Sequence, residues 1–241
     1  MNGAPLVAVH QPNFFPWLGF FDKLSRADVF ILLDDAQFPR SAKGTWTNRV
    51  SVLVQGRRHW LTAPVDRSGG AQPINQVRTA PGAAWKMKLL ATLRHSYSRA
   101  PRFAEAWKHV EPLVVNPDEM LWRYNLIGIK ALAGLLGLDT SKIRLASEFG
   151  VAETGTARLA ALALAAGGGS YLCGDGADGY QDDGLFARVG LELRRQNFVH
   201  PVYPQSGNAE FVLGLSVLDA LFNLGAEGAR ELINRREKSH E

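Results

Sequence analysis

The chain has 241 residues, of which 46% are hydrophobic and 21% are charged, as in a globular protein with a full hydrophobic core. Its net charge of +4 is spread along the chain without an arginine-rich run or a zinc-finger spacing, so the sequence does not indicate nucleic-acid binding. Cys173 is the only cysteine, which excludes an intramolecular disulfide and a cysteine-based zinc cluster.

The sequence also lacks the features of a secreted or membrane-spanning protein. Its first residues show neither the charged start nor the long apolar run of a signal peptide. The most apolar stretches, residues 126–138 and 159–166, are shorter than the roughly 20 residues needed to span a bilayer. We therefore expect a cytoplasmic protein without a membrane span.

The first 35 residues predict a strand, a loop, a helix and a second strand. Residues 6–9 are β-prone, and the apolar residues from Trp17 to Arg26 recur at helical spacing. Residues 28–33 are almost wholly apolar, which is typical of a parallel strand buried on both faces. Two parallel strands joined in this way indicate an α/β fold.

Further along the chain, strands and helices alternate at the C-terminal end, while helices cluster in the middle. Two strands are expected within residues 47–62. The later expectations are helices at 84–97, 102–114 and 118–137, a strand at 141–146, a helix at 154–166, strands at 171–173 and 191–198, and a helix from Ser216. This order predicts a single α/β domain over residues 1–241. We expect a Rossmann-like, mainly parallel sheet flanked by helices, with a helical insertion or subdomain at about 84–138.

The turn after the first strand is the first candidate site. His10 is expected at the carboxyl end of a parallel strand, where open α/β sheets bind ligands. Gln11 and Asn13 lie beside prolines that restrict the loop, and Gly19 opens a helix whose N-terminus favours anions. The turn therefore suits substrate binding with His10 as a catalytic group. The alternative is a rigid turn around a core histidine.

A pair of carboxylates follows the second strand. Burial and mutual repulsion would raise the pKa values of Asp34 and Asp35, so that either could act as a general base. They could also bind Mg²⁺, which prefers oxygen ligands. The N-terminal turn after His10 loosely resembles the strand–turn–helix element of nucleotidylyltransferases, which use magnesium, although Trp17 stands where that pattern has a histidine. A solvated strand end is the alternative.

Two further segments carry polar candidates. Lys43 is expected in a flexible loop that could reach an anionic group, and Arg49 could bind phosphate or carboxylate through two hydrogen bonds, with Asn48 beside it. His200 precedes a proline after a predicted strand, so that its imidazole is a second candidate for a general base. Tyr203 and Gln205 of the same segment are candidate substrate-binding residues.

Cys173 also lies at a predicted strand end, before a glycine-rich loop. Aspartates at positions 175, 178, 182 and 183 would oppose formation of a thiolate there. A small buried thiol is the preferred interpretation over a nucleophile.

Taken together, these motifs resemble the WbqC-like protein family. The segment from His10 to Lys23 is similar to the opening signature of that family, and the similarity continues at residues 34–38, 48–49, 60–65, 200–205 and 215–225. Members of the family are associated with bacterial surface-polysaccharide gene clusters and are described as glycine or aminoacyl transferases that act on amino sugars. Relatives occur beside carrier-protein-dependent pathways.

The resemblance implies an acyl or aminoacyl (glycine) transferase that forms an amide on an amino sugar or another amine. An acyl-carrier-protein thioester is one candidate donor, and no cofactor is identified. In this hypothesis His10 or His200 removes a proton from the amine. Asn48 or the backbone N–H groups at the helix start around Gly19 stabilise an oxyanion, and Lys43 or Arg49 holds a phosphate. Two alternatives stay open: a nucleotide-dependent enzyme using magnesium at Asp34 and Asp35, and a non-catalytic carbohydrate-binding protein.

Overall fold

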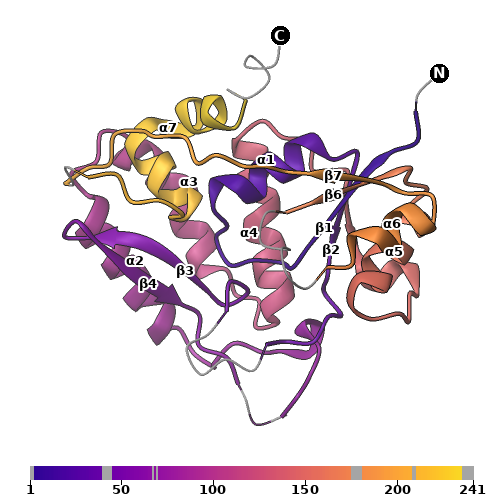
Figure 1. The fold of residues 1–241 in the computed structure, drawn as a ribbon. Helices are drawn as coiled ribbons and strands as arrows, with labels where there is room; N and C mark the ends of the chain where they lie inside the picture. The colour runs from indigo at the N-terminus through magenta and orange to yellow at the C-terminus, as the bar shows by residue number, and fades with distance from the viewer. Residues whose placement is uncertain are drawn as a thin grey trace.

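A parallel five-stranded sheet lies at the centre of the protein, in the strand order β5-β2-β1-β6-β7 (Figure 1). The computed structural model describes residues 3–39, 45–66, 68, 70–174, 181–207 and 210–234. The strands are β1 (Leu6–His10), β2 (Val29–Leu32), β5 (Ile143–Leu145), β6 (Ser170–Cys173) and β7 (Glu192–Arg195). The expected Rossmann-like α/β fold with a mainly parallel sheet is confirmed.

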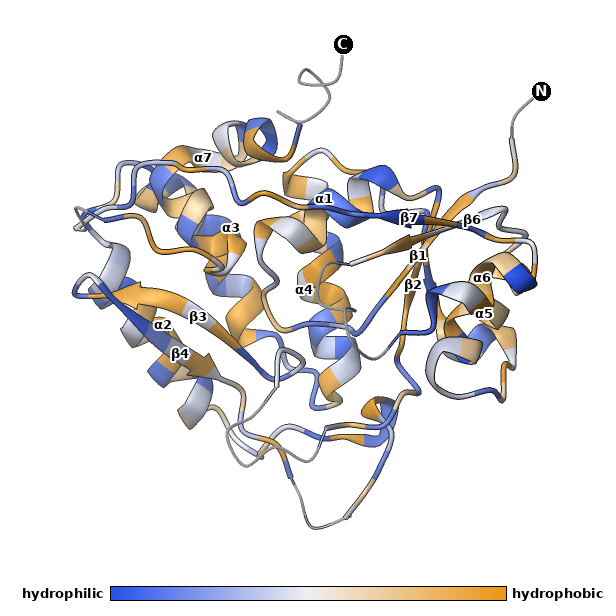
Figure 2. Cartoon of the chain, viewed as in Figure 1, coloured by the Kyte–Doolittle hydropathy of each residue, from blue (hydrophilic) through white to orange (hydrophobic). Residues whose placement is uncertain are grey.

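Helices cover both faces of this sheet. Alternate residues of β1 contribute to different hydrophobic clusters, since Ala8 packs on one side and Val7 and Val9 on the other. The Ala8 side is covered by α1 (Leu18–Arg26), α4 (Leu121–Leu135) and α7 (Val217–Asn234), and the other side by α5 (Gly155–Ala165) and α6 (Asp183–Arg188). Figure 2 shows the contrast between the hydrophobic β1 and the hydrophilic β7, which forms an exposed edge of the sheet.

The chain between β2 and β5 forms the expected insertion, which is larger than its predicted helical part. It begins with a separate hairpin of β3 (Arg49–Val54) and β4 (Arg57–Thr62). Gln55 and Gly56 both have positive φ angles, of 50° and 72°, which is the conformation of the tight hairpin turns that match the twist of the flanking strands. The short helix η1 (Ile74–Gln76) then precedes α2 (Ala84–Tyr97), α3 (Phe103–Val115) and α4, while η2 (Ala146–Phe149) follows β5.

A long crossing segment, residues 196–207 and 210–216, leads from β7 over the molecule to the hairpin and α7 (Figure 1). It begins where the positive φ of Asn197, 48°, ends the strand that the sequence predicted to continue to residue 198. At its far end the Ser216 amide donates to the Ser51 carbonyl at 2.8 Å, and the Arg58 guanidinium donates to the Leu213 carbonyl. The C-terminal part of the chain therefore joins the sheet to the insertion.

A buried carboxylate fixes this junction. Asp219 of α7 is completely buried and accepts hydrogen bonds from the Tyr97 and Tyr203 hydroxyl groups, each at 2.8 Å. Burial raises the pKa of Asp219, and the hydrogen bonds from the tyrosines oppose that shift. The carboxylate thus links α2, the crossing segment and α7.

None of the helices in the described ranges is long and apolar enough to cross a membrane.

The Asp219 junction leads to a stability prediction. Tyr203→Phe should lower the free energy of unfolding by about 1.5–3 kcal/mol, because it removes a donor from a buried charged acceptor. Tyr124→Phe is the matched control, since its hydroxyl donates at 2.9 Å to the neutral Val114 carbonyl, and its loss should cost about 0.5–1.5 kcal/mol. Urea-induced unfolding of both variants at pH 7 measures the difference; equal losses would contradict the assigned role of Asp219.

Candidate functional site

The candidate site lies where the strand order changes direction, at the carboxyl ends of β1 and β6. From β1 the chain proceeds first to β2 and β5 on one side and later to β6 and β7 on the other, so that a crevice for ligands is expected between β1 and β6. His10 is the last residue of β1, and Cys173 is the last residue of β6. The N-terminal turn is therefore placed as the sequence predicted.

Hydrogen bonding fixes the proton position on the His10 ring. Its Nδ1 lies 3.0 Å from the Gln11 carbonyl oxygen, and because a carbonyl can only accept, Nδ1 carries the hydrogen. Nε2 therefore has a free lone pair. The half-buried ring makes edge-to-face contacts with the rings of Trp17 and Phe20, whose centroids lie 5.6 and 4.9 Å from that of His10.

The surroundings of His10 keep it neutral. Burial first, and then the positive charge of Lys23, lower its pKa from 6.5 to about 3, while the bond to the Gln11 carbonyl acts in the opposite direction. Lys23 is 3% exposed, and its Nζ donates to the Val9 carbonyl at 3.0 Å. At neutral pH the imidazole is a proton acceptor beside a buried cation.

Lys23 is a site residue that the sequence interpretation missed. It follows Gly19 and Phe20 by four and three residues, which places it on the buried face of α1 together with Leu24. A lysine in the apolar stripe of a helix was the signal that could have identified it. Gly174 lies nearby, since a Cβ built on it would be 3.6 Å from Lys23 Nζ.

The turn after His10 is held by the insertion. The Asn125 side-chain amide on α4 donates to the Pro12 carbonyl at 2.8 Å and to the Thr47 carbonyl at 2.7 Å. The Thr47 hydroxyl in turn donates to Gln11 Oε1 at 3.1 Å. Gln11 is thus positioned by residues that lie far away in the sequence.

Asn13 contributes buried hydrogen-bonding groups that the described residues do not use. Its side chain is 2% exposed, and neither its Nδ2 nor its Oδ1 has a partner there. The Oδ1 atom of the neighbouring Asn125 is also buried and without a hydrogen-bond partner among the described residues. Buried polar atoms are rarely left unpaired, so this turn has the capacity to bind water or a polar ligand group.

The two carboxylates after β2 bind neighbouring protein groups. Asp34 accepts hydrogen bonds from the backbone and the hydroxyl of Ser147, at 3.0 and 2.7 Å. Asp35 forms an ion pair with Arg158 of α5, with 2.6 Å between Oδ1 and Nη2. Within the described ranges, no group of three or more His, Cys, Asp or Glu side chains is arranged to hold a metal ion. A magnesium role for Asp34 and Asp35 stays a prediction, and their contacts tie β2 to η2 and α5.

Asn48 and Arg49 lie beside the turn but have structural contacts of their own. The Asn48 amide donates to the Ala63 carbonyl at 3.0 Å and accepts from the Thr45 amide at 2.9 Å. The Arg49 guanidinium lies 4.1 Å from the centre of the Trp60 ring. Lys43 lies outside the described residues.

Gly19 serves packing in this structure. A Cβ at this position would lie 2.7 Å from Trp17 Nε1 and 2.8 Å from a carbon of Phe198, so both side chains fill the space above the helix start. The sequence had indicated an anion-binding helix start at this position. Gly19 instead lets the crossing segment approach the N-terminal turn.

The second predicted half of the site is further along the crossing segment. His200 contacts Phe198 and Phe211 edge-on, and its Nδ1 is 3.3 Å from the Pro201 carbonyl. Burial, with a smaller effect of Arg58, lowers its pKa. Its Nε2 is buried and lacks a partner within the described ranges.

The other polar residues of that half point into the protein. Tyr203 donates to Asp219, and burial raises its pKa well above the ordinary range. The Gln205 side chain forms two hydrogen bonds with the Val212 backbone, at 3.0 and 2.8 Å. Their contacts shape the crossing segment.

The structure thus brings the predicted residues together in two groups. His10, Gln11, Asn13 and Gly19 lie together on the segment that joins β1 to the start of α1. His200 instead contacts Phe198 and Phe211 of the crossing segment. Within the described ranges, His10 and His200 do not hydrogen-bond to each other; contacts through Trp17, Gly19 and Phe198 connect them.

Cys173 fits the expectation of a buried thiol. It is 1% exposed, and its sulfur donates to the Gly174 carbonyl at 3.3 Å. Burial raises its pKa, which disfavours the thiolate that a nucleophile requires.

Comparison with known proteins identifies one family and one curated relative. The family model described as the WbqC-like protein family matches residues 11–231. The relative is the uncharacterized protein Rv1507c of Mycobacterium tuberculosis, which is 30% identical over 227 residues, covering 92% of this chain and 94% of the relative. No solved structure matches the chain.

The lowered pKa of His10 predicts acid sensitivity. Below pH 6.5 the imidazole of the unfolded chain is protonated, whereas that of the folded protein stays neutral down to about pH 3. The free energy of unfolding therefore decreases as the pH falls from 6.5 to about 3. Between pH 7 and about pH 4.5, the wild type should lose about 2–3 kcal/mol more of its unfolding free energy than His10→Gln. Urea unfolding at both pH values measures this, and a pH-independent difference between the two proteins would contradict the burial of a neutral imidazole.

The contacts of Gly19 predict a packing defect. Gly19→Ala should lower the free energy of unfolding by about 1–3 kcal/mol, because the added methyl group forces Trp17 and Phe198 apart. In the control Gly128→Ala, within α4, the added Cβ meets nothing within 4 Å, so stability should rise by up to about 1 kcal/mol. Thermal and urea unfolding test the pair; a neutral Gly19→Ala would show that the space above α1 is open.

Proposed function

The chain belongs to the WbqC-like protein family, and from this premise we propose that it is an acyl or aminoacyl transferase that forms an amide on an amine. The observation that carries the proposal is the neutral His10 at the carboxyl end of β1, with Nδ1 bonded to the Gln11 carbonyl and Nε2 left to accept a proton. An amine that attacks an acyl group must lose a proton, and a positioned imidazole is the usual acceptor. The acceptor amine is an amino sugar or a related amine, in keeping with the family resemblance.

The proposed reaction proceeds in two steps. The amine nitrogen attacks the acyl carbon, its proton passes to His10 Nε2, and the carbonyl oxygen becomes an oxyanion. The oxyanion then collapses, the bond from the acyl carbon to the leaving group breaks, and the proton passes from His10 to that group. A carrier thiol or a phosphate is a suitable leaving group. No covalent intermediate on Cys173 is required.

Lys23 explains how an imidazole with a low pKa can serve in this reaction. Burial is the main cause of the low pKa of His10 in the free protein, and the charge of Lys23 lowers that pKa further. A negative charge that forms near the ammonium offsets this effect, so the proton affinity of His10 rises as the oxyanion develops. Buried charges arranged in advance for the transition state are an effective form of catalysis.

The nucleotide-dependent alternative has less support. Its proposed magnesium ligands, Asp34 and Asp35, bind Ser147 and Arg158.

The transferase proposal also places the enzyme in the cytoplasm, where carrier-bound and otherwise activated acyl donors are produced.

A transfer assay tests the proposal. The purified protein is incubated with a panel of aminoacyl and acyl carrier thioesters and amino sugars, and mass spectrometry follows the acceptor. We expect the mass of one acyl group to be added, and His10→Gln should lower the rate by about 10²–10⁴-fold.

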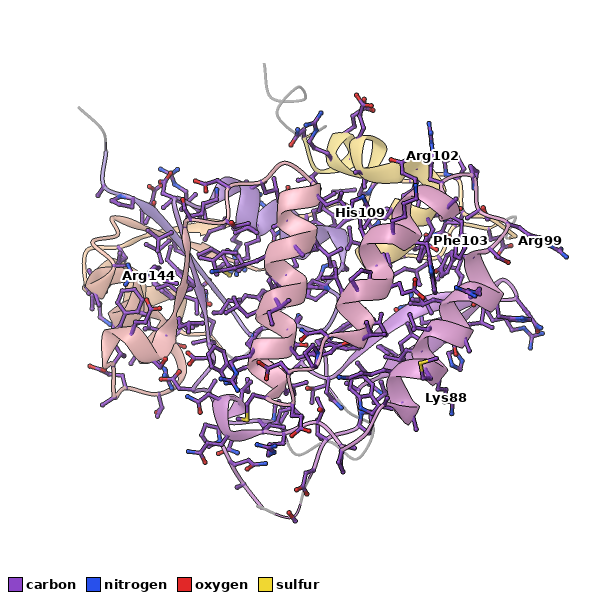
Figure 3. All side chains as sticks on the ribbon, turned by 180° about the vertical axis from the view of Figure 1, so that it is seen from behind. Lys88, Arg99, Arg102, Phe103, His109 and Arg144 are labelled. Carbon is purple, nitrogen blue, oxygen red and sulfur yellow. The ribbon has the colours of Figure 1, made fainter. Side chains whose placement is uncertain are left out.

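His109→Gln is the matched control, because His109 is an exposed histidine of α3, labelled on the rear face in Figure 3. It should leave the rate unchanged. Transfer at the wild-type rate by His10→Gln would remove His10 from the mechanism. Absence of any mass increase across the panel would contradict the transferase proposal and favour a non-catalytic binding protein.

A further inference from the structure

Three tryptophans form a continuous path of rings that starts at His10. The Trp17 ring centre lies 5.6 Å from that of His10, Trp46 lies 5.1 Å from Trp17, and Trp60 lies 5.5 Å from Trp46. Trp17 precedes α1, Trp46 precedes the hairpin, and Trp60 belongs to β4. The fold therefore brings these rings together from three separate parts of the chain.

The outer two rings face solvent although they are large and apolar. Trp46 is 40% exposed and Trp60 is 37% exposed, in contact with each other and beside the polar turn of His10. Single exposed apolar side chains are ordinary, whereas adjacent ones next to a candidate site indicate a binding surface.

Contacts within the protein fix the Trp46 backbone and restrain the Trp60 ring. The Trp46 carbonyl accepts a hydrogen bond from the Phe14 amide at 2.9 Å, which ties its backbone to the N-terminal turn. The Arg49 guanidinium stacks on Trp60 at 4.1 Å and restrains that ring. A surface that is ordered beforehand binds a ligand at a lower entropic cost.

We propose that Trp46 and Trp60 form the acceptor subsite, on which the ring of a sugar stacks with its amine directed along Trp17 toward His10. This inference rests on the proposed transfer to an amine, and it selects a ring-bearing amine over an acyclic one. Aromatic faces carry partial negative charge, and the C–H groups on one side of a sugar ring are weakly positive.

The angles between the rings favour a puckered ring over a flat one. Trp17 and Trp46 are inclined at 48°, and Trp46 and Trp60 at 63°. Inclined rings form an angled surface, whereas a flat nucleobase held between two aromatic planes needs them to be parallel. One face of Trp60 is moreover covered by Arg49.

The exposed area of Trp46 and Trp60 indicates how large a ligand they can cover. A stable protein interface covers roughly 800 Å² on each partner. A tryptophan side chain buries about 150–250 Å² at most, so two partly exposed rings can cover only a small molecule.

Ligand-observed NMR tests the subsite without requiring turnover. The probes are free hexosamines (glucosamine, galactosamine and mannosamine), ethanolamine as an amino alcohol without a ring, and adenosine as a flat ring. At least one hexosamine should receive saturation at its ring protons, and Trp46→Ala should weaken its binding at least tenfold. Trp46→Phe, which keeps an aromatic face, should retain most of the affinity, and Trp122→Phe on α4 should leave it unchanged.

The outcomes separate this inference from the proposed function. Failure of every hexosamine to bind the folded wild type, equal binding to Trp46→Ala, or Trp46-dependent binding of adenosine alone would overturn the sugar subsite. So would ethanolamine binding that depends on Trp46 as strongly as hexosamine binding does. Trp46-dependent hexosamine binding without acyl transfer would support the subsite and contradict the transferase. In the transfer assay, Trp46→Ala should raise KM for the sugar at least tenfold, whereas His10→Gln should lower kcat.

Discussion

A single side chain of the insertion holds the turn on which the candidate site depends. Asn125 of α4 donates one hydrogen bond to the Pro12 carbonyl and another to the Thr47 carbonyl, so its amide joins the end of β1 to the start of the hairpin. The contact is buried, where a hydrogen bond is strengthened and an unpaired group is costly. The positions of Gln11 and His10 therefore depend on how α4 and the start of the hairpin pack against the end of β1.

That arrangement explains why the electrostatics of the site can be unusual. Lys23 is buried beneath the turn with its ammonium bonded to the Val9 carbonyl, in surroundings that normally exclude a cation. The Val9 carbonyl accepts a hydrogen bond from the ammonium, and the positive charge adds to burial in lowering the pKa of His10 to about 3. A neutral acceptor next to a fixed positive charge suits a reaction in which negative charge develops on a substrate oxygen. It suits less well a site built to bind a metal cation.

The local patterns of the sequence were sufficient for the architecture and for the position of the N-terminal turn at the end of β1. The apolar run of β2 and the helical spacing of α1 are set by burial within a few residues, and both elements were confirmed. Long-range contacts were not predictable in this way. The partners of Asn125 are 113 and 78 residues away, and the aspartate that Tyr203 and Tyr97 share belongs to α7, so these side chains could equally have faced a ligand. Likewise, spacing could not show that Phe198 fills the space above Gly19.

The two parts of the fold contribute different things to the proposed site. The β1–α1 unit supplies the groups proposed to move a proton and to stabilise charge, His10 on β1 and Lys23 on α1, and burial sets the electrostatic properties of both. The insertion supplies Trp46 and Trp60, which are partly exposed and contribute little to the core. Because the exposed rings can change without disturbing the buried pair, the choice of acceptor is physically separable from the chemistry. A substitution on the hairpin would then alter which amine is bound, whereas one beneath the turn would alter both the reaction and the stability of the fold.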